Sequence, residues 1–473
     1  MKIIALHFCV LVLLGSLPGF SQTQETTHTR IVRMTNQQMD SIYNIRERRA
    51  IQKALKKIAA YEINTRKDTL INISIAGGHL REVPEFIQYC TNLKLLRMES
   101  NNFDSFPAFM GNLHELIYLN LTDNNLTEIP GFIFQLENLE TLNLSSNRIT
   151  KLPRELNRME HLKEIGLYNM HNNIRKLKIR KNNTITRVVL RGNDLKKLPR
   201  SIKKLKQLKY IDLSNNLFTS IPKNLRKSKK LKTLQISRNS IVLDKYNFSK
   251  INQLEKIKMN YCDINYLPSR FFDLVNLTEL QLAENNLQLL SGDIGKLKKI
   301  EILTLYKNNL TTLPDELFTL ENLHTIDLYY NNLTKISPNL GNLKKLKILY
   351  LSFNKLYRIP DEIQKLGELE ELYLHHNKLS EVPEGIGELN RLRVLHLNNN
   401  YLNIFPDKIL KLSNLIDLDI SSNDIRNFPL ELTGLDKLFL VFIQENPTAE
   451  SDNPAELKKM ITYFEKAGVK INY

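Results

Sequence analysis

The chain has 473 residues, a length that corresponds to about three domains of ordinary size, and 42% of the residues are hydrophobic, enough to build a large core. Lys and Arg number 67 against 50 Asp and Glu, which gives a formal net charge of +17. The content of 3 Cys, 16 Gly and 16 Pro excludes a disulfide-stapled scaffold, a collagen-like chain and a low-complexity linker protein.

The first 21 residues have the pattern of a secretory signal peptide. Lys2 supplies a positive charge, residues 3–15 form an apolar stretch too short to cross a bilayer, and small residues precede the expected cleavage site before Gln22. Cys9 lies inside the apolar stretch rather than at a cleavage site, so a lipid-modified cysteine is not expected. We therefore expect an exported protein with no transmembrane segment in the mature chain.

A helix is predicted next, over residues 35–60, with Thr35 or Asn36 as its N-cap. We expect this helix, within a segment 22–69, to close one end of the structure that follows. The apolar residues that recur at helical spacing are Met39, Ile42, Tyr43, Ile51, Leu55 and Ile58.

A 23-residue repeat fills the chain from Leu70 to about residue 447. The pattern LxxLxLxxNxLxxLPxxIxxLxx begins 17 times, the last time at Leu438, without an insertion or a deletion. Position 4 is aliphatic in every copy, position 9 is Asn in 14 copies, and 12 of the 16 prolines stand at position 15. Repetition at such a period is typical of solenoids, so a single elongated array replaces the three domains that the length suggests.

The repeat resembles that of the leucine-rich repeat superfamily, in the 23-residue form with Leu-Pro that is found in bacterial secreted proteins and in the Ras-suppressor and Scribble-like groups. The resemblance implies an α/β fold, a right-handed solenoid with a curved parallel sheet on its concave face and short helical or irregular crossovers on its convex face. The residues agree with this fold, because apolar positions 4 and 6 alternate as in a short strand. The Asn at position 9 is expected to satisfy buried backbone groups, and the Pro at position 15 to preset the crossover.

One repeat, residues 162–184, departs from the pattern. Met170 replaces the Asn of position 9, and the Leu-Pro pair is missing. The length stays at 23, so the solenoid is expected to continue, and both a local change of curvature and a contact point for a partner remain open. Cys90 and Cys262 replace repeat residues about eight repeats apart, so they are not expected to pair with each other.

The basic surplus is local, because residues 162–258 contain 26 Lys and Arg against 5 Asp and Glu, whereas the remainder contains 41 against 45. Such a patch attracts polyanions, which for an exported protein would be an acidic glycan or lipid head groups rather than nucleic acid. The alternative is a solvated flank that maintains solubility. The candidate polyanion-binding residues are Lys203, Lys204, Lys206, Lys227, Lys229, Lys230, Arg191 and Arg238.

From the eleventh repeat onward, aromatic and histidine residues replace the small and polar residues at positions 5, 7 and 8. Neighbouring strands lie ~4.8 Å apart, so these side chains should form one patch on the concave face. Such patches are typical of binding hot spots, and stacking that only stabilises neighbouring repeats is the alternative. Histidines without cysteines do not complete a zinc site, so no metal is expected. The candidate partner-binding residues are Tyr306, Tyr329, Tyr330, Tyr350, Phe353, Tyr373, His375, His376 and His396.

A second helix is predicted after the last repeat, with Asp452 or Asn453 as its cap, Pro454 in its first turn and Gly468 after its end. Its apolar residues are Leu457, Met460, Ile461 and Phe464. The expected organisation is a signal peptide at 1–21, an N-terminal segment with a capping helix at 22–69, the solenoid at 70–447, and a capping helix with a tail at 448–473.

The motifs of serine hydrolases, P-loop enzymes and zinc proteases are missing from the sequence, and no block outside the repeats is large enough for a catalytic domain. We therefore predict an exported, non-catalytic protein without cofactors, whose concave surface binds another protein. The alternative is an envelope protein that holds acidic glycan or an anionic membrane surface through residues 162–258. Exported animal and plant relatives usually carry cysteine-rich caps, which are missing here, so a bacterial protein of the periplasm, cell surface or medium is favoured.

Overall fold

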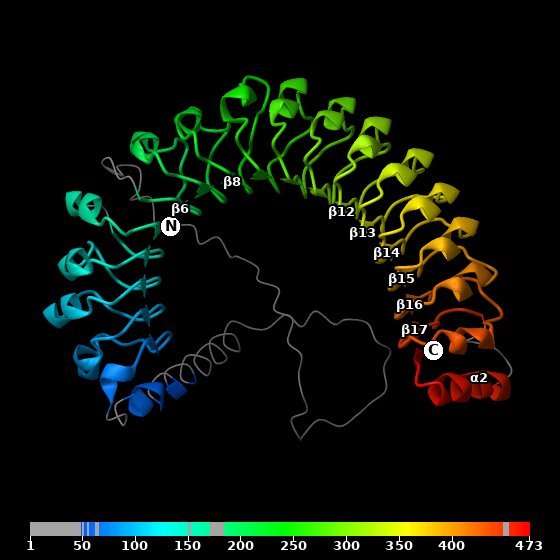
Figure 1. The fold of residues 1–473 in the computed structure, drawn as a ribbon, viewed down its shortest axis with the longest axis horizontal. Coiled ribbons are helices and arrows are strands. Elements are labelled where there is room, and N and C mark those ends of the chain that lie inside the picture. The colour runs from blue at the N-terminus through cyan, green and yellow to red at the C-terminus, as the bar shows by residue number, and fades with distance from the viewer. Residues whose placement is uncertain are drawn as a thin grey trace, which may run out of the picture. The chain divides into compact units, whose positions relative to one another are not determined.

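The computed structural model describes residues 49, 52–53, 56–61, 66–149, 153–170, 184–447 and 454–473 (Figure 1). The chain divides into two units, Met1–Ala50 and Ile51–Tyr473, and the second unit holds all of the repeats. The predicted signal peptide, the first part of the predicted N-terminal helix and residues 171–183 of the irregular repeat lie outside the described residues.

The described part of the second unit contains one parallel sheet of 18 strands, and each strand is three residues long. Each of the 17 repeats contributes one strand from its positions 3–5, where the alternation of apolar residues predicts it. The strands are β1 (Asn72–Ser74), β2 (Leu95–Arg97), β3 (Tyr118–Asn120), β4 (Thr141–Asn143), β5 (Glu164–Gly166), β6 (Arg187–Val189), β7 (Tyr210–Asp212), β8 (Thr233–Gln235), β9 (Lys256–Lys258), β10 (Glu279–Gln281), β11 (Ile302–Thr304), β12 (Thr325–Asp327), β13 (Ile348–Tyr350), β14 (Glu371–Tyr373), β15 (Val394–His396), β16 (Asp417–Asp419), β17 (Leu440–Phe442) and β18 (Lys470–Asn472).

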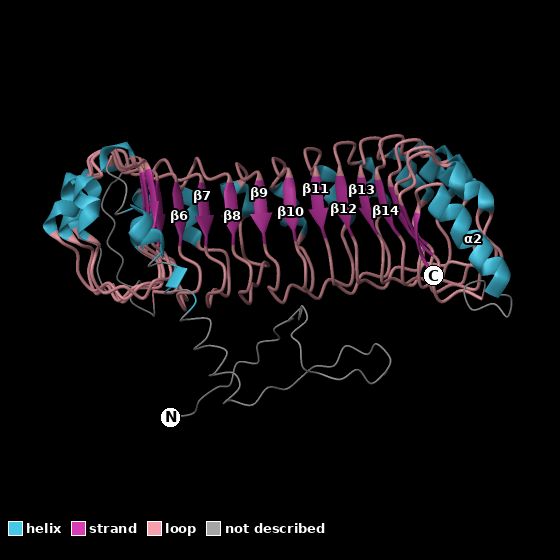
Figure 2. Cartoon of the chain, turned by 90° about the horizontal axis from the view of Figure 1, so that it is seen from below, coloured by secondary structure: helices cyan, strands magenta, loops and turns pink. Residues whose placement is uncertain are grey.

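Each strand pairs in parallel with the next strand of the chain. From β1 to β17, residues that are 23 apart stand opposite each other, as Ile326 and Leu349 do. Figures 1 and 2 show the strands side by side along the inner, concave side of this unit, with the crossovers on its outer side. From β1 to β17 the middle residue of each strand is buried in one continuous core, so each repeat depends on its neighbours to cover it.

The crossovers contain short 3-10 helices, most of which begin directly after position 15 of the repeat. Pro314 shows the usual arrangement, since its extended backbone (φ −73°, ψ 147°) leads directly into the helix. In two repeats a serine, Ser291 or Ser337, replaces the proline, and its side chain accepts a hydrogen bond from the backbone N–H two residues later. The 3-10 helices are η1 (Lys67–Thr69), η2 (Glu85–Tyr89), η3 (Ala108–Asn112), η4 (Gly131–Gln135), η5 (Arg154–Arg158), η7 (Arg200–Lys204), η8 (Lys223–Lys227), η9 (Phe248–Ile251), η10 (Ser269–Asp273), η11 (Gly292–Lys296), η12 (Asp315–Thr319), η13 (Pro338–Asn342), η14 (Asp361–Lys365), η15 (Glu384–Glu388), η16 (Asp407–Lys411) and η17 (Leu430–Gly434).

The asparagines of position 9 link successive repeats, as predicted. The side-chain Nδ2 of Asn308 donates hydrogen bonds to the carbonyl oxygens of Leu282 (3.0 Å), Leu305 (3.0 Å) and Tyr306 (3.3 Å). Its Oδ1 accepts a hydrogen bond from the backbone N–H of Leu287 at 3.1 Å. One buried side chain therefore satisfies backbone groups of two repeats that water cannot reach.

Cys262 stands at position 9 of the ninth repeat and takes over part of this role. Its Sγ lies 3.4 Å from the carbonyl oxygen of Ile236 and 3.5 Å from that of Asn260, the carbonyls that correspond to two partners of Asn308. Burial raises the pKa of the Cys262 thiol to about 12, so the thiol stays protonated. Cys90 is also buried, and both cysteines are free, as predicted.

At the N-terminal end, the described residues of the predicted helix are helical at 49, 52–53 and 56–61. Ile58 is buried in the core, and the Tyr61 ring stacks on Phe86 with a centroid distance of 5.8 Å. The Tyr61 hydroxyl also accepts a hydrogen bond from the backbone N–H of Ser74 in β1, at 3.4 Å. These contacts place the end of the helix against the first repeat.

At the C-terminal end, helix α2 (Pro454–Lys466) buries Met460 and Phe464. A tail is predicted after this helix, but the structure has strand β18, which pairs with β17. Gly468 has a left-handed backbone with φ +78°, which reverses the chain, and the buried Val469 holds the strand against the core. The edge of the sheet at β17 is thereby covered by β18.

The array continues through the irregular repeat, as predicted, because β5 and β6 pair with Ile165 opposite Val188. Met170 is buried in place of the asparagine, and its N–H donates to Oδ1 of Asn193 at 2.8 Å. The crossover that would show a change of curvature or a partner contact lies at 171–183, outside the described residues. Within the ranges that the structure describes, no helix has the length and apolar character needed to cross a membrane.

Candidate functional site

The nine predicted partner-binding side chains lie on β11–β15 and on the residues that directly follow these strands. We refer to them together as the ring cluster. Because equivalent residues of neighbouring repeats stand opposite each other, the cluster forms three rows that cross the strands. The rows are Tyr350, Tyr373 and His396 at position 5, then Tyr306, Tyr329 and His375 at position 7, and Tyr330, Phe353 and His376 at position 8.

The rows at positions 5 and 8 are stacked. In the first, the Tyr350 and Tyr373 rings are nearly parallel with centroids 4.8 Å apart, and His396 meets Tyr373 edge-on at 5.0 Å. In the row at position 8, Phe353 stacks on Tyr330 at 4.2 Å and on His376 at 3.9 Å. Tyr330 is 41% exposed and the other eight rings are half-buried, so both a binding role and a stabilising role agree with this packing.

Two rings of the row at position 7 lean toward each other beside a small residue, Ser352, which is not among the predicted site residues. Ser352 stands between Tyr329 and His375, whose backbones are two strand spacings, about 9.6 Å, apart. Their ring centroids are nevertheless only 5.8 Å apart. The two rings lean together because Ser352 is small, and its fully buried hydroxyl has no hydrogen-bond partner among the described residues.

The row at position 8 has a backbone that does not suit bulky residues. Position 8 is left-handed in all 17 repeats, and φ is 55° at Tyr330, 54° at Phe353 and 54° at His376. This conformation favours Gly, Asn and Asp and costs other residues roughly 1–2 kcal/mol each. Asn215 and Asn399 occupy the same position elsewhere, with φ of 53° at both, so the backbone itself does not call for rings.

The two adjacent histidines are uncharged near neutral pH. His375 Nδ1 lies 3.0 Å from His376 Nδ1, so one ring donates a hydrogen bond to the other. Burial, together with the neighbouring histidines, lowers the pKa of His375 to about 4, and burial also lowers the pKa of His376. Among the described residues, no group of three His, Cys, Asp or Glu side chains could hold a metal ion. The absence of a metal and of a cofactor stays a prediction.

Protonation of these histidines is expected to make the protein less stable in acid. The folded pKa of His375 is below that of the unfolded chain, so the unfolded state binds more protons between about pH 6.5 and 4, and stability falls as the pH decreases through this window. The matched variant is His375→Asn with His376→Asn, since Asn398 and Asn399 hold these positions in the next repeat. The free energy of unfolding is measured with urea at pH 7 and at pH 5. Its decrease between these two pH values is expected to be about 1 kcal/mol larger for the wild type than for the variant, a value discounted for the partial exposure of the rings. Equal losses in both proteins would contradict the assignment.

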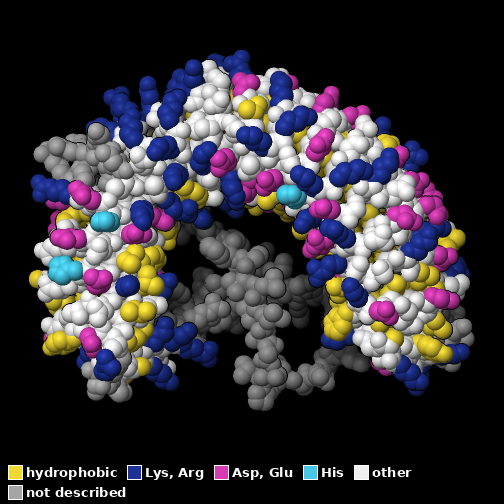
Figure 3. Space-filling view, in the orientation of Figure 1, with side chains coloured by type: hydrophobic (Ala, Val, Ile, Leu, Met, Phe, Trp, Pro, Cys, Tyr) yellow, Lys and Arg dark blue, Asp and Glu magenta, His cyan; other side chains and the backbone are white. Residues whose placement is uncertain are grey.

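The eight predicted polyanion-binding residues are all exposed, but they fall into two groups. The six lysines lie in or just after η7 and η8, and Figure 3 shows Lys and Arg side chains gathered on the outer side of this part of the array. Among the described residues, no carboxylate lies within ion-pair distance of these lysines. Arg191 and Arg238 follow β6 and β8 on the strand side instead, and the Arg238 guanidinium lies 4.1 Å from the centroid of the Tyr261 ring.

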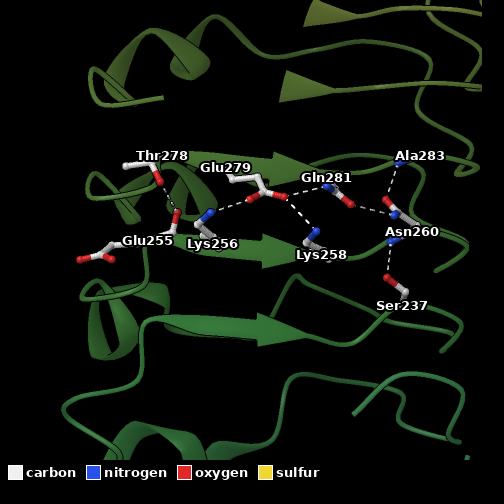
Figure 4. A network of polar contacts seen from close by, with 9 residues as sticks. All are labelled: Ser237, Glu255, Lys256, Lys258, Asn260, Thr278, Glu279, Gln281 and Ala283. Atoms are coloured by element: carbon white, nitrogen blue, oxygen red, sulfur yellow. Dashed lines mark hydrogen bonds and ion pairs between the residues drawn. The ribbon is translucent and has the colours of Figure 1, made fainter. Parts of the chain in front are cut away.

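Part of the basic surplus is neutralised on the strand side by a network that the sequence analysis misses (Figure 4). Glu279 in β10 forms ion pairs with Lys256 (3.1 Å) and Lys258 (3.0 Å) of β9 and accepts a hydrogen bond from Gln281 (2.7 Å). These hydrogen bonds and ion pairs lower the pKa of Glu279 despite its burial, which alone would raise it. The 23-residue register is the signal that could have revealed the network, since it places Glu279 opposite Lys256.

Two family models for leucine-rich repeats match segments of the repeat array. The model described as a leucine-rich repeat region matches residues 282–402, which include the ring cluster, and the model described as a leucine rich repeat matches residues 114–174 and 183–241. The chain belongs to the leucine-rich repeat superfamily. Its parallel sheet and short crossovers are those of a leucine-rich repeat solenoid, as the repeat pattern predicts.

Solved leucine-rich repeat structures are similar to most of the chain. A leucine-rich repeat protein of Leptospira interrogans is 28% identical, with a TM-score of 0.63 over 86% of this chain and 97% of that protein. The Drosophila Toll in its complex with Spätzle is 22% identical, with a TM-score of 0.64 over 82% of this chain and 60% of that one. The plant peptide hormone receptor RGFR1, solved in complex with RGF2, is 23% identical, with a TM-score of 0.52 over 80% of this chain and 79% of the receptor. A comparison with curated protein sequences finds no match.

Proposed function

We propose that this leucine-rich repeat protein is an exported, non-catalytic binding protein that holds a protein partner on the strand side of β11–β15. The observation that carries the proposal is the ring cluster, in which nine aromatic and imidazole side chains cross five consecutive strands. Large rings of this kind supply most of the binding energy in many protein interfaces, because they bury much area at little cost in side-chain entropy.

The strain at position 8 supports binding over stacking alone. Stacking between Tyr330, Phe353 and His376 does hold neighbouring repeats together. The left-handed backbone opposes rings at this position, and Asn fits it without that cost. The stacking of these three rings must therefore offset a conformational cost before it can stabilise the array.

Export and the absence of catalysis are parts of the same proposal. The signal-peptide pattern of residues 1–21 supports export, and the missing enzyme motifs support a binding role without cofactors. Leucine-rich repeat arrays are typical of protein–protein interaction modules, because stacking repeats creates an extended curved surface.

Selection of peptides from a random display library on the purified protein tests the binding role. The dissociation constants of the selected peptides are then measured for the wild type and for the variant Tyr350→Thr with Tyr373→Thr. Threonine is the matched replacement, because Thr304 holds position 5 in the eleventh repeat. We expect the variant to bind at least about 100-fold more weakly, the loss typical of hot-spot rings. Peptides that bind both proteins equally would contradict the proposal.

A second candidate function is supported by the exposed lysines of η7 and η8, for which no carboxylate partner is described. Six cations on one outer surface suit an acidic glycan or an anionic membrane surface, which would hold the protein at the cell envelope. This function and the first one use opposite sides of the array, so they do not exclude each other.

Retention on immobilised heparin tests this second function. The variant carrying Lys203→Gln, Lys204→Gln, Lys227→Gln and Lys230→Gln is expected to elute at a lower salt concentration than the wild type, because fewer counterions are released on binding. The control carries the same number of changes on later crossovers, at Lys298, Lys299, Lys344 and Lys345. If the control eluted at the same salt concentration as the first variant, retention would depend only on net charge, and a specific binding surface at η7 and η8 would be contradicted.

A further inference from the structure

Carboxylates flank the stacked row of the ring cluster at both ends. The register of β12–β16 sets Asp327, Tyr350, Tyr373, His396 and Asp419 opposite one another in a single row. The row therefore presents two tyrosine rings and an imidazole between two negative charges.

Two more carboxylates stand in the adjacent row, at position 3. Glu371 Oε2 accepts a hydrogen bond from the Tyr373 hydroxyl at 2.9 Å. Asp417 Oδ2 lies 3.4 Å from His396 Nε2, and the other carboxylate oxygen, Oδ1, is buried without a hydrogen-bond partner among the described residues. We call Asp327, Glu371, Asp417 and Asp419 the carboxylate frame.

The fold does not require these negative charges. Oδ1 of Asp327 and of Asp419 accepts a hydrogen bond from the backbone N–H two residues later, at 3.1 Å in both cases. Asn120 and Asn143 make the same contact at position 5 of earlier repeats, at 3.1 and 3.2 Å, with a neutral side chain. Burial raises the pKa of Asp327, which means that its charge is poorly solvated.

Two other carboxylates on the strand side are paired with cations of the chain itself. Glu279 is paired with two lysines and Glu284 with Lys307, at 2.9 Å. Among the described residues, no Lys or Arg forms an ion pair with the carboxylate frame, and none occupies positions 3, 5, 7 or 8 of repeats 12–16. Two lysines of these repeats are directed elsewhere, since Lys347 lies 3.9 Å from Glu370 and Lys378 lies over the Tyr357 ring.

One row of the same sheet shows how a guanidinium fits such a setting. Glu164, Arg187 and Tyr210 stand opposite one another in β5, β6 and β7. Arg187 Nε donates to Glu164 Oε1 at 2.9 Å, and the guanidinium lies 3.5 Å from the centroid of the Tyr210 ring. Glu371 and Tyr373 likewise place a carboxylate beside a tyrosine ring, although here both lie on β14 and are joined directly by a hydrogen bond, and among the described residues no arginine forms an ion pair with Glu371.

We propose that the partner presents a cationic peptide segment to this surface, with an arginine or lysine side chain that lies along the stacked Tyr350 and Tyr373 rings and ends at the carboxylate frame. This inference rests on the proposed function and specifies the chemistry of the partner. Cation–π contact with the rings and ion pairing with the half-buried carboxylates act together on the same side chain.

The test is isothermal titration of the purified protein with hexa-arginine, hexa-lysine and hexa-glutamate peptides. Hexa-arginine is expected to bind more tightly than hexa-lysine, because a guanidinium stacks on rings and pairs in a bidentate manner. Its affinity is expected to fall at least tenfold when the frame is neutralised by Asp327→Asn, Glu371→Gln, Asp417→Asn and Asp419→Asn. A control variant with four neutralised carboxylates outside the strand side is expected to bind hexa-arginine as tightly as the wild type. Its changes are Glu316→Gln, Glu321→Gln, Glu381→Gln and Glu431→Gln.

Hexa-arginine that does not bind, or that binds the frame variant and the wild type equally, overturns the proposal. So does an equal loss in the frame variant and in the control, since the effect is then one of net charge. The display selection separates this failure from that of the proposed function. If the selected peptides need the rings but contain no Lys or Arg, the binding function stands and the cationic partner is contradicted. If the selected peptides bind independently of the rings, the proposed binding function itself is contradicted.

Discussion

Replacing the row at position 8 with asparagine, by Tyr330→Asn, Phe353→Asn and His376→Asn, is expected to weaken the binding of selected peptides at least about 100-fold while the melting temperature stays within about 4 °C of the wild type. Asparagine is the matched residue, because Asn215 and Asn399 hold the same left-handed position. Titration of the peptides and a thermal unfolding curve on the same samples check the two parts of this prediction.

The small effect on stability follows from two opposing terms. The variant loses two stacked contacts, Tyr330 on Phe353 and Phe353 on His376, each worth about 0.5–1.5 kcal/mol. It gains about 1 kcal/mol or more at each residue that no longer forces a ring onto a left-handed backbone. The matched control is Tyr261→Asn, a ring at the same position with φ 54° but four strands before β13. A large fall in melting temperature with unchanged affinity would show that the rings serve stability.

The second large effect is expected in the ladder of asparagines. Asn308→Ala should lower the free energy of unfolding by about 3 kcal/mol, because it removes the four hydrogen bonds of one buried side chain and leaves their backbone partners unsatisfied. Urea unfolding followed by circular dichroism measures this loss.

Two further variants calibrate the result. Asn309→Ala changes the next residue, which is exposed, and is expected to cost less than about 0.5 kcal/mol. Asn308→Cys should lose less stability than Asn308→Ala, since Cys262 shows that a thiol at position 9 contacts two of the corresponding carbonyls. If Asn308→Ala were no more harmful than Asn309→Ala, the ladder would not stabilise the array.

The repeat explains why so much of the fold is predictable from the sequence. A fixed spacing of 23 residues assigns the Leu, Asn and Pro residues of the consensus positions to structural roles, and it also places residues of neighbouring repeats opposite each other. The ring cluster is predictable for the same reason, because its members share three positions of the repeat. Strand β18 lies outside the repeat and is held by pairing with β17 and by packing of Val469 and Ile471, so the periodic pattern does not predict it.

Features that depend on side-chain direction are harder to predict. The closure of Tyr329 and His375 over Ser352 requires the rings to tilt along the sheet, which the spacing of residues does not determine. The two groups of basic residues differ in the same way, since lysines of the crossovers face outward while Arg238 rests on a ring of the strand side. The ion pairs of Glu279 with two lysines neutralise positive charge locally on the strand side, which the net charge of the chain does not reveal.

Hydroxyl-radical footprinting of the protein with and without a selected peptide shows whether the ring cluster is the binding surface, because it reports the exposure of individual rings in solution. Slower oxidation of Tyr330, Tyr350 and Tyr373 is expected when the peptide is bound. Tyr357, which belongs to the same repeat as Tyr350 but is 55% exposed outside the ring cluster, should be oxidised at an unchanged rate. Protection of Tyr357, with no protection of the ring cluster, would contradict the claim that the strand side of β11–β15 is the binding surface.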